Sequence, residues 1–260
     1  MENMQNSGGP AIAVKDLRKS FGEQKVLNGV NLQVGRGETL VILGQSGTGK
    51  SVFLKLLIGL LKPDSGSIEV AGKELKGLEM DNLNQIRKKV GFLFQQSALY
   101  DSLSVEENVA FPLARNGPMA PGEQKDRVRN LLSQVGMESD GSKMPSEISG
   151  GMQKRVGLAR ALALQPDILL CDEPTAGLDP ITAREIEDLI LKLQKERQMA
   201  SVVVTHDLRG AKTISNRLAV LHQGNILIEG TFEDLQKSHD SFVLRFMAEG
   251  AQTPCHEQSV

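Results

Sequence analysis

Residues 44–51, with the sequence GQSGTGKS, have the types and the spacing that a phosphate-binding loop needs. They match the pattern G-x-x-x-x-G-K-[ST] and lie between a continuous apolar run and a helical pattern, which is the context that such a loop requires. Glycines let the backbone amides wrap closely around phosphates, and the N-terminus of the following helix adds partial positive charge. The expected phosphate-binding residues are Gly44, Gln45, Ser46, Gly47, Thr48, Gly49, Lys50, Ser51 and Val52.

Two side chains of this loop carry specific chemistry. Lys50 can reach the β- and γ-phosphates of a nucleotide, where it also assists catalysis, and Ser51 can place its hydroxyl on Mg²⁺. A flexible glycine turn is the alternative interpretation, but it explains neither the lysine nor the serine. The loop therefore predicts binding of ATP with Mg²⁺.

Two adjacent carboxylates end the apolar run ILLCDEP at 168–174. At the C-terminal end of a buried parallel strand, Asp172 could join the Mg²⁺ shell, and Glu173 could polarise the attacking water as a general base. Alone, such a pair is more often a solvated strand end. Together with a phosphate-binding loop, it predicts hydrolysis of the nucleotide.

Two further polar residues follow apolar strands. His206 ends SVVVTH, where it could contact the γ-phosphate and hold the water together with Glu173. Gln95 follows VGFLF, where it could reach Mg²⁺ or the water. A structural histidine and an ordinary loop glutamine are the alternatives, and only the other motifs favour catalytic roles.

A second anion-binding end is predicted at Ser149, Gly150 and Gly151, which precede a basic amphipathic run with a helical pattern. The serine hydroxyl, the glycine amides and the helix dipole would together bind an anion. One nucleotide does not need two such ends from the same chain. We therefore expect two copies to pack head to tail, so that the Ser149 end of each supplies charge stabilisation in trans to the nucleotide held by the other.

The elements that position these residues follow from the hydrophobic periodicity. Alternating segments from 11 to about 43 predict half-buried strands, and TLVIL at 39–43 predicts a buried parallel strand followed by a helix at 51–61. The region from about 104 to 165 predicts a helical insertion. Buried strands with following helices return at DILLCDEP and ASVVVTHD, and Gln223-Gly224-Asn225 predicts a hairpin turn. This order is typical of an α/β protein.

Length, charge and cysteine content bound the class further. The 260 residues allow one large domain with an insertion, and 30 basic against 32 acidic residues give a net charge of -2, which does not favour a nucleic-acid partner. Cys171 and Cys255 lie far apart, as suits a reducing cytosol. The apolar stretch at 52–61 is too short to span a membrane and is broken by Lys55, so any work at a membrane would need a separate partner. Residues 1–10 are expected to be disordered.

These motifs, in this order, resemble the ABC ATPase family over roughly residues 11–231. The resemblance implies a P-loop NTPase core with a parallel sheet, an N-terminal antiparallel β subdomain and an inserted helical subdomain. It also implies that Phe21 stacks on adenine and that Asp179, in AGLD, is the D-loop aspartate that links two nucleotide sites. A core aromatic is the alternative for Phe21.

The chain departs from the usual family pattern at two places. Ile148 and Met152 stand where L-S-G-G-Q has its first and last residues, and Val52 follows Ser51 where threonine is common. The anion contacts come from a hydroxyl and backbone amides, so Met152 should remove only a polar side-chain contact. Ser51 still offers its hydroxyl to Mg²⁺.

Four segments are similar to the ATPases of MCE-associated phospholipid transporters, the Mla-type subgroup: SGGM, NVAFPL, DEPTAGLDPIT and SFVLRFMAEG. This likeness implies a peripheral subunit at the cytoplasmic face of the inner membrane, which drives phospholipid transport through a separate permease and an MCE-domain protein. A transporter of another cargo, and a soluble ATPase of iron-sulfur cluster assembly, are the alternatives. Intact Lys50, Asp172, Glu173 and His206 argue against a module that has lost hydrolysis.

Two surfaces could bind partners. Leu99, Tyr100, Leu103 and Val105 could receive a permease helix, or could instead pack between the subdomains. In the extension 232–260, Phe242, Leu244, Phe246 and Met247 fit one short amphipathic helix before a disordered tail. That helix could reach the partner ATPase and steady the dimer, or pack on its own domain.

Overall fold

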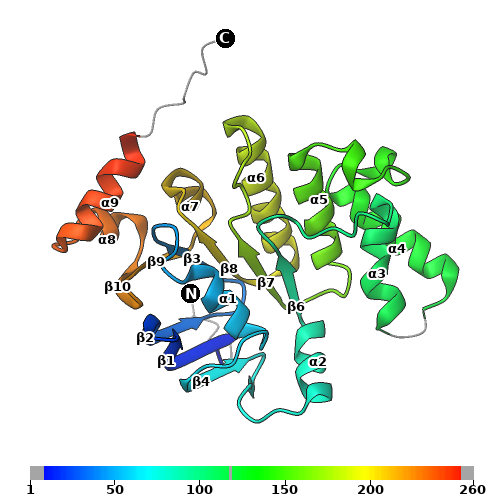
Figure 1. Ribbon diagram of the computed structural model, residues 1–260. Helices are drawn as coiled ribbons and strands as arrows, with labels where there is room; N and C mark the ends of the chain where they lie inside the picture. Colours follow the sequence, from blue (N-terminus) through cyan, green and yellow to red (C-terminus); the bar gives the residue numbers. More distant parts are fainter. Residues whose placement is uncertain (1–8, 117–118, 253–260) are drawn as a thin grey trace, which may run out of the picture.

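The computed structural model describes residues 9–116 and 119–252, which form two sheets with helices around them (Figure 1). The smaller sheet is antiparallel and has four strands in the order β2-β1-β4-β5. Their bounds are Ile12–Phe21 for β1, Gln24–Val34 for β2, Ser65–Val70 for β4 and Lys73–Glu74 for β5. The predicted disordered segments fall largely on 1–8 and 253–260, outside the described residues.

The larger sheet has six strands in the order β10-β9-β3-β8-β7-β6. All neighbours in it are parallel except β10, which pairs with β9 in the predicted hairpin. The strand bounds are Thr39–Leu43 for β3, Val90–Leu93 for β6, Ile168–Asp172 for β7, Ala200–Thr205 for β8, Arg217–His222 for β9 and Asn225–Gly230 for β10.

Both faces of the large sheet are covered, which explains why β3, β7 and β8 are continuous apolar runs. On one face Leu40 and Ile42 pack with α1 (Lys50–Leu57) and the small sheet. On the other face Val41 and Leu43 pack with α5 (Gly150–Ala161), α6 (Pro180–Arg197) and α7 (Leu208–Ile214). Two hydrophobic cores therefore lie on opposite sides of one sheet.

The predicted helix at 51–61 is shorter in the structure, because α1 ends at Leu57. Gly59 has a left-handed φ of 63°, and its amide donates to the carbonyl of Leu56 while the amide of Leu60 donates to that of Lys55. This pair of hydrogen bonds is a Schellman motif, which commonly ends a helix. Among the described helices, none combines the length and the apolar character that a membrane crossing demands.

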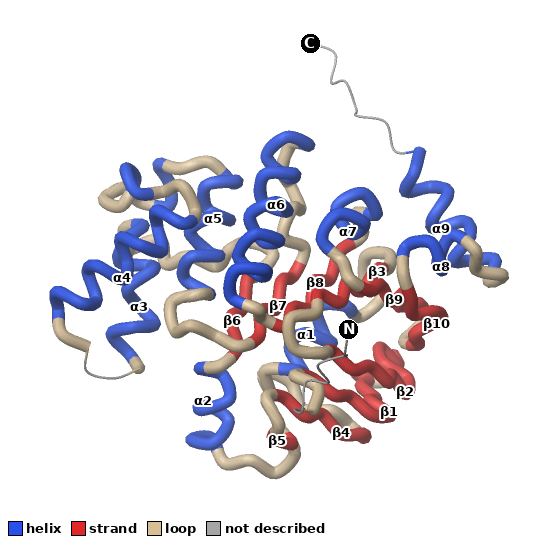
Figure 2. Tube along the Cα trace, turned by 180° about the vertical axis from the view of Figure 1, so that it is seen from behind, coloured by secondary structure: helices blue, strands red, loops and turns tan. Residues whose placement is uncertain are grey.

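A block of helices is inserted between β6 and β7, on the opposite side of the molecule from α8 and α9 (Figures 1 and 2). It contains α3 (Val105–Arg115), α4 (Pro121–Gln134) and α5, with two short 3-10 turns between α4 and α5. A capping box starts α3, in which the Ser104 hydroxyl accepts from the Glu107 amide and the Glu107 carboxylate accepts from the Ser104 amide. The inserted helical subdomain predicted from the sequence is present, and α2 (Met80–Lys88) precedes β6.

The C-terminal extension has two helices where one was predicted, α8 (Phe232–Gln236) and α9 (Ser241–Gln252). Helix α9 packs against α7 and α8, with Val243 fully buried and the Phe242 ring stacked on His222 at 3.6 Å between centroids. Leu244, predicted to share the apolar face, is 44% exposed. The extension therefore packs on its own domain.

Candidate nucleotide-binding site

The predicted phosphate-binding loop connects the C-terminal end of β3 to α1. Gly49 is the N-cap of α1, with φ of 102° and no side-chain cap, so the first amides of the helix have no partner from a capping side chain. A methyl group on Gly49 would lie 2.7 Å from Val26 Cγ1, and one on Gly44 would lie 2.6 Å from the Leu221 carbonyl oxygen. Glycine is therefore required here by both backbone conformation and close approach.

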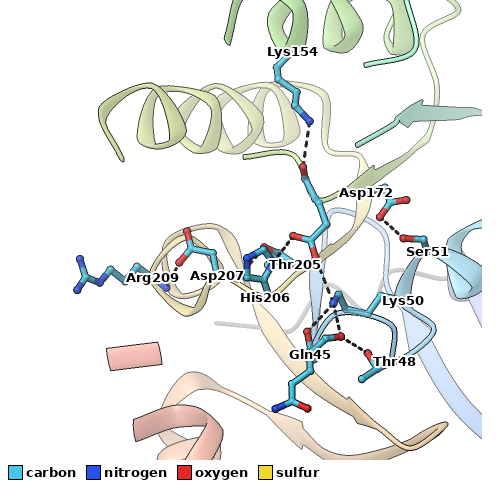
Figure 3. Close-up of polar contacts among 12 residues, drawn as sticks. Gln45, Thr48, Lys50, Ser51, Lys154, Asp172, Thr205, His206, Asp207 and Arg209 are labelled. Atoms are coloured by element: carbon cyan, nitrogen blue, oxygen red, sulfur yellow. Dashed lines mark hydrogen bonds and ion pairs between the residues drawn. The ribbon is translucent and has the colours of Figure 1, made fainter. Parts of the chain in front are cut away.

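Lys50 is buried inside the loop (Figure 3). Its ammonium donates to the carbonyl oxygens of Gly44 at 2.7 Å and Gln45 at 3.0 Å, and lies 3.4 Å from Glu173 Oε1. The Thr48 hydroxyl donates to the same Gln45 carbonyl at 2.8 Å. The cation is thus held where the loop turns around, as contact with the β- and γ-phosphates would require.

Ser51 and Asp172 meet although they come from α1 and β7. The Ser51 hydroxyl donates to Asp172 Oδ1 at 2.8 Å. Burial raises the pKa of Asp172 and the nearby Glu173 adds to this, whereas the Ser51 hydrogen bond lowers it. Among the described residues no group of three or more His, Cys, Asp or Glu side chains could hold a metal alone. The two oxygens suit Mg²⁺ that completes its shell with phosphate oxygens and water.

Glu173 and His206 also come together, as predicted. Glu173 Oε2 lies 3.0 Å from His206 Nδ1, while its other oxygen faces Lys50. The Glu173 backbone has a left-handed φ of 46°, and its amide donates to the Val204 carbonyl at 2.9 Å. The Glu173 side chain is only 10% exposed, whereas that of His206 is 58% exposed. This carboxylate is therefore fixed from two sides, as a general base must be.

A hollow of about 310 Å³ lies beside Lys50, Ser51 and Glu173, whereas Asp172 and His206 are not among the residues that line it. It includes Gln95, which the sequence predicted from its place after a strand, and Phe21, which is 48% exposed. Phe21 is the last residue of β1. The hollow is lined by Phe21, Val26, Ser46, Gly47, Gly49, Lys50, Ser51, Val52, Gln95 and Glu173.

The second predicted anion site lies at the N-terminus of α5, and its residues do not line this hollow. The Ser149 hydroxyl accepts from the Met152 amide at 3.3 Å, so its own hydrogen is free to be donated. A methyl group on Gly151 would lie 2.4 Å from Thr182 Cγ2 on α6, whereas one on Gly150 would meet only Leu178, at 3.7 Å. Gly151 is therefore needed for packing within the chain, and Gly150 is not.

Asp179 lies near this second end and also outside the hollow. As the N-cap of α6, its Oδ1 accepts from the amides of Ile181 and Thr182, each at 3.0 Å. Hydrogen bonds, first that from the Thr182 side chain, hold the pKa of Asp179 below its usual value. The predicted nucleotide-contacting residues thus form two groups, one around α1 and one at the starts of α5 and α6.

Lys154 is a residue that the sequence pattern did not single out, because the run after Gly151 was interpreted only as a basic amphipathic helix. The side chain is buried, and its ammonium donates to the backbone carbonyls of Gln95 and Glu173. Figure 3 shows one of these bonds, drawn from Lys154. The signal was present in the spacing, because Lys154 shares a helical face with Gly151, Gly157 and Leu158, all of which are buried.

A phosphate-binding loop after β3, with a carboxylate pair at the end of β7 and a histidine after β8, defines a P-loop ATPase. The model of the ABC transporter family matches residues 27–176, and the chain belongs to this family. It is the ATP-binding and ATP-hydrolysing subunit, an ABC ATPase.

The relatives carry several different names. The chain is 42% identical over 239 residues to a probable ribonucleotide transport ATP-binding protein, mkl, of Mycobacterium leprae, covering 92% of this chain and 69% of that protein. It is 39% identical to the chloroplastic protein trigalactosyldiacylglycerol 3 of Arabidopsis thaliana, covering 94% and 75%. It is also 39% identical to the methionine import ATP-binding protein MetN of Brucella abortus, covering 88% and 62%.

Solved structures agree with the fold. The cassette MJ0796, described as a dimer in a post-hydrolysis state bound to ADP and Pi, superimposes with a TM-score of 0.78 at 36% identity, covering 85% of this chain and 98% of that one. CbiO1 from Clostridium perfringens, part of the transporter complex cbiONQ, gives 0.81 at 30% identity, covering 89% and 92%.

Proposed function

We propose that two copies of this chain form a head-to-tail dimer in which ATP lies between the phosphate-binding loop of one copy and the Ser149 end of the other. The observation that carries the proposal is the separation of these two anion-binding ends. Ser149, Gly150 and Gly151 are outside the hollow that contains Lys50 and Glu173. The dimeric state described for MJ0796 supports the formation of a dimer.

The geometry suggests a role for each group in hydrolysis. Glu173 accepts a proton from water as the water attacks the γ-phosphorus, and His206 holds the Glu173 carboxylate in place. Lys50 binds the β- and γ-phosphate oxygens, and Mg²⁺ held by Ser51 and Asp172, with Gln95 nearby, would neutralise charge on them. The Ser149 hydroxyl and the first amides of α5 stabilise the transition-state charge from the partner copy.

A second hollow, with an aromatic lining, supports docking on a membrane permease and therefore a role in a transporter. This hollow, of about 390 Å³, lies beside the segment that follows Gln95, and Tyr100 and Phe111 pack in it with ring centroids 4.6 Å apart. Of the predicted surface residues only Tyr100 lines it; Val105 is fully buried and Leu99 packs on the core. The aromatic lining suits an apolar helix from a separate subunit.

We propose phospholipid as the cargo, carried through a permease and an MCE-domain protein, with the ATPase on the cytoplasmic face of the inner membrane. Four sequence segments similar to the Mla-type subgroup support this choice, and so does the relative named after a galactolipid. Ribonucleotide and methionine, named for other relatives, make transport of another cargo the second candidate. A soluble assembly ATPase is the third.

Glu173→Gln tests the dimer directly. This variant should hydrolyse ATP about 10³-fold more slowly, because the attacking water is no longer polarised. It should still bind ATP and accumulate as a closed dimer, measured by light scattering with and without Mg²⁺-ATP. Glu123→Gln, an exposed change on α4, is the control. A slow variant that binds ATP but stays monomeric would contradict the trans arrangement.

The cargo needs a different experiment. The tagged protein is purified from native membranes in mild detergent, and the associated proteins and lipids are identified by mass spectrometry. A polytopic permease with an MCE-domain protein and phospholipid is the expected result. A different permease would change the cargo, and recovery without any membrane protein would favour the assembly ATPase.

A further inference from the structure

Lys154 is a buried cation in the middle of the molecule. Its residue is 4% exposed, and among the residues that the structure describes no carboxylate forms an ion pair with it. Burial lowers its pKa. The charges of Asp172 and Glu173 favour the ammonium from a greater distance, but the ammonium donates its hydrogen bonds to two backbone carbonyls. Burying a charge without an ion pair is costly, so stability alone does not explain the presence of lysine here.

The two carbonyls that Lys154 contacts belong to residues of the nucleotide-binding hollow. The ammonium is 3.2 Å from the Glu173 carbonyl oxygen and also bonds that of Gln95. Glu173 is held in the left-handed region, at φ 46°, which is uncommon for a residue with a side chain. Such a conformation persists only where its surroundings hold it, and it is frequent at functional sites.

A second cation of α5 holds the segment that follows Gln95. Arg160 donates to the carbonyl oxygens of Ser97 at 2.6 Å and Ala98 at 2.7 Å. Ser97 and Ala98 also have left-handed φ values, of 58° and 48°. Helix α5 therefore hydrogen-bonds to the backbones of three non-glycine residues with left-handed φ values: Ser97, Ala98 and Glu173.

Close packing of α5 against β6 makes these hydrogen bonds possible. A methyl group on Gly157 would lie 3.0 Å from Leu93 Cδ1 and 3.3 Å from Ser97 Cβ. Since Gly157 has no side chain, α5 can lie against the end of β6, within reach of the Gln95 backbone. Ser149 is the N-cap of the same helix and precedes Lys154 by about one and a half turns.

We propose that Lys154 is a positioning residue that ties α5 to the backbones of Gln95 and Glu173. Lys154 does not line the hollow, so it acts through Glu173 rather than on the nucleotide. In the proposed dimer, on which this part rests, α5 engages the partner's nucleotide through Ser149 and transmits that engagement to the general base of its own chain.

The test compares Lys154→Met, Lys154→Arg and the surface control Lys192→Met, whose lysine is 61% exposed on α6. Lys154→Met should lower kcat about 10²-fold at saturating ATP, because misplacement of the base by about 1 Å has that effect. The KM for ATP and the Kd for a fluorescent ATP analogue should stay within about twofold. Lys154→Arg should restore most of kcat, and Lys192→Met should match the wild type.

A double-mutant cycle separates positioning from general loss of structure. If Lys154 acts through Glu173, then adding Lys154→Met to Glu173→Gln should slow hydrolysis no further. Multiplicative losses, or a wild-type kcat for Lys154→Met, would overturn the inference. If Lys154→Met melts early, Lys154→Leu, which also removes the donor, takes its place in the cycle, and rates are measured below its melting temperature.

The same variants distinguish this inference from the dimer proposal. If Glu173→Gln binds ATP but stays monomeric while Lys154→Met is slow with unchanged KM, the trans arrangement fails and the positioning role stands. If Glu173→Gln dimerises while Lys154→Met hydrolyses at the normal rate, the dimer stands and the positioning role fails.

Discussion

The N-terminal ends of α1 and α5 have similar residues, but only the end of α1 lies beside a hollow that can hold a nucleotide. Both helices begin with small residues, and both place a lysine in a buried position. At α1, Gly49 is buried, and the hollow beside it is lined by Lys50 and Ser51 of α1 and by Glu173, which follows β7. At α5, Ser149 and Gly150 are exposed, and neither of them is among the residues that line this hollow.

This difference shows how one chain can hold a whole binding site for phosphate and only half of a second. The α1 end is surrounded by its own domain because it follows the central strand of a parallel sheet. The α5 end is carried by the helical insertion, which places it at the surface. In the proposed dimer, the nucleotide bound by the partner copy would complete this exposed N-terminus.

Ser149→Ala tests the incomplete end and should have the largest effect of the tests that follow. Loss of a preorganised donor commonly lowers kcat by about 10²- to 10³-fold. Binding of ATP to the monomer should be unchanged, because Ser149 does not line the hollow. Steady-state phosphate release and binding of a fluorescent ATP analogue measure the two quantities.

Ser104→Ala is the matched control, because Ser104 caps α3 in the way that Ser149 caps α5. Each change should reduce stability by about 1 kcal/mol through the lost cap. Only Ser149→Ala should lower the rate. Equal rates for the two variants would remove the trans role of Ser149.

The two glycines of this end should respond oppositely. Gly151→Ala should lower the Tm by a few degrees, since its methyl group meets Thr182 and overpacking costs about 1–3 kcal/mol. Gly150→Ala should keep the Tm but lower kcat about 10-fold, because its methyl group stands where the partner's nucleotide would approach. Thermal melts and rates of both variants are the measurement; normal activity in Gly150→Ala would mean that nothing approaches this surface.

The smallest effect concerns α6, the helix on which Gly151 packs. Burial, with the charges of Asp207 and Asp188, raises the pKa of Glu187 to about 7 from 4.5. The folded chain then holds a proton that the unfolded chain releases, so stability should fall as pH rises from about 4.5 to 7. Below this window the carboxyl is protonated in both states and the loss disappears.

Glu187→Gln should therefore lose less stability than the wild type between about pH 5 and pH 8, by a few degrees in Tm. Glu196→Gln, an exposed change on the same helix, is the control. Thermal melts across this range measure the difference, and parallel curves for wild type and Glu187→Gln would contradict the raised pKa.

The sequence predicted those features that depend on local pattern. The phosphate-binding loop, the apolar strands and the hairpin at Gly224 each have a short signature that fixes the local backbone. The meeting of Ser51 with Asp172, and of Glu173 with His206, could be predicted as well, because parallel strands bring their C-terminal ends to one edge.

Other features depend on packing between distant segments and could not be predicted this way. The burial of Lys154 requires the close approach of α5 to β6, which no single segment reveals. The aromatic hollow beside Tyr100 combines residues from β6, α3 and α5. The exposure of Leu244 follows from a second, unforeseen helix that turns α9 onto α7.

The separation of Ser149 from the hollow has a genetic consequence. In the proposed dimer, a chain with Ser149→Ala still offers an intact Glu173, and a chain with Glu173→Gln still offers an intact Ser149. Each allele alone would be defective. A cell that expresses both would assemble mixed dimers with one wild-type site and one doubly damaged site, so the two alleles would complement each other.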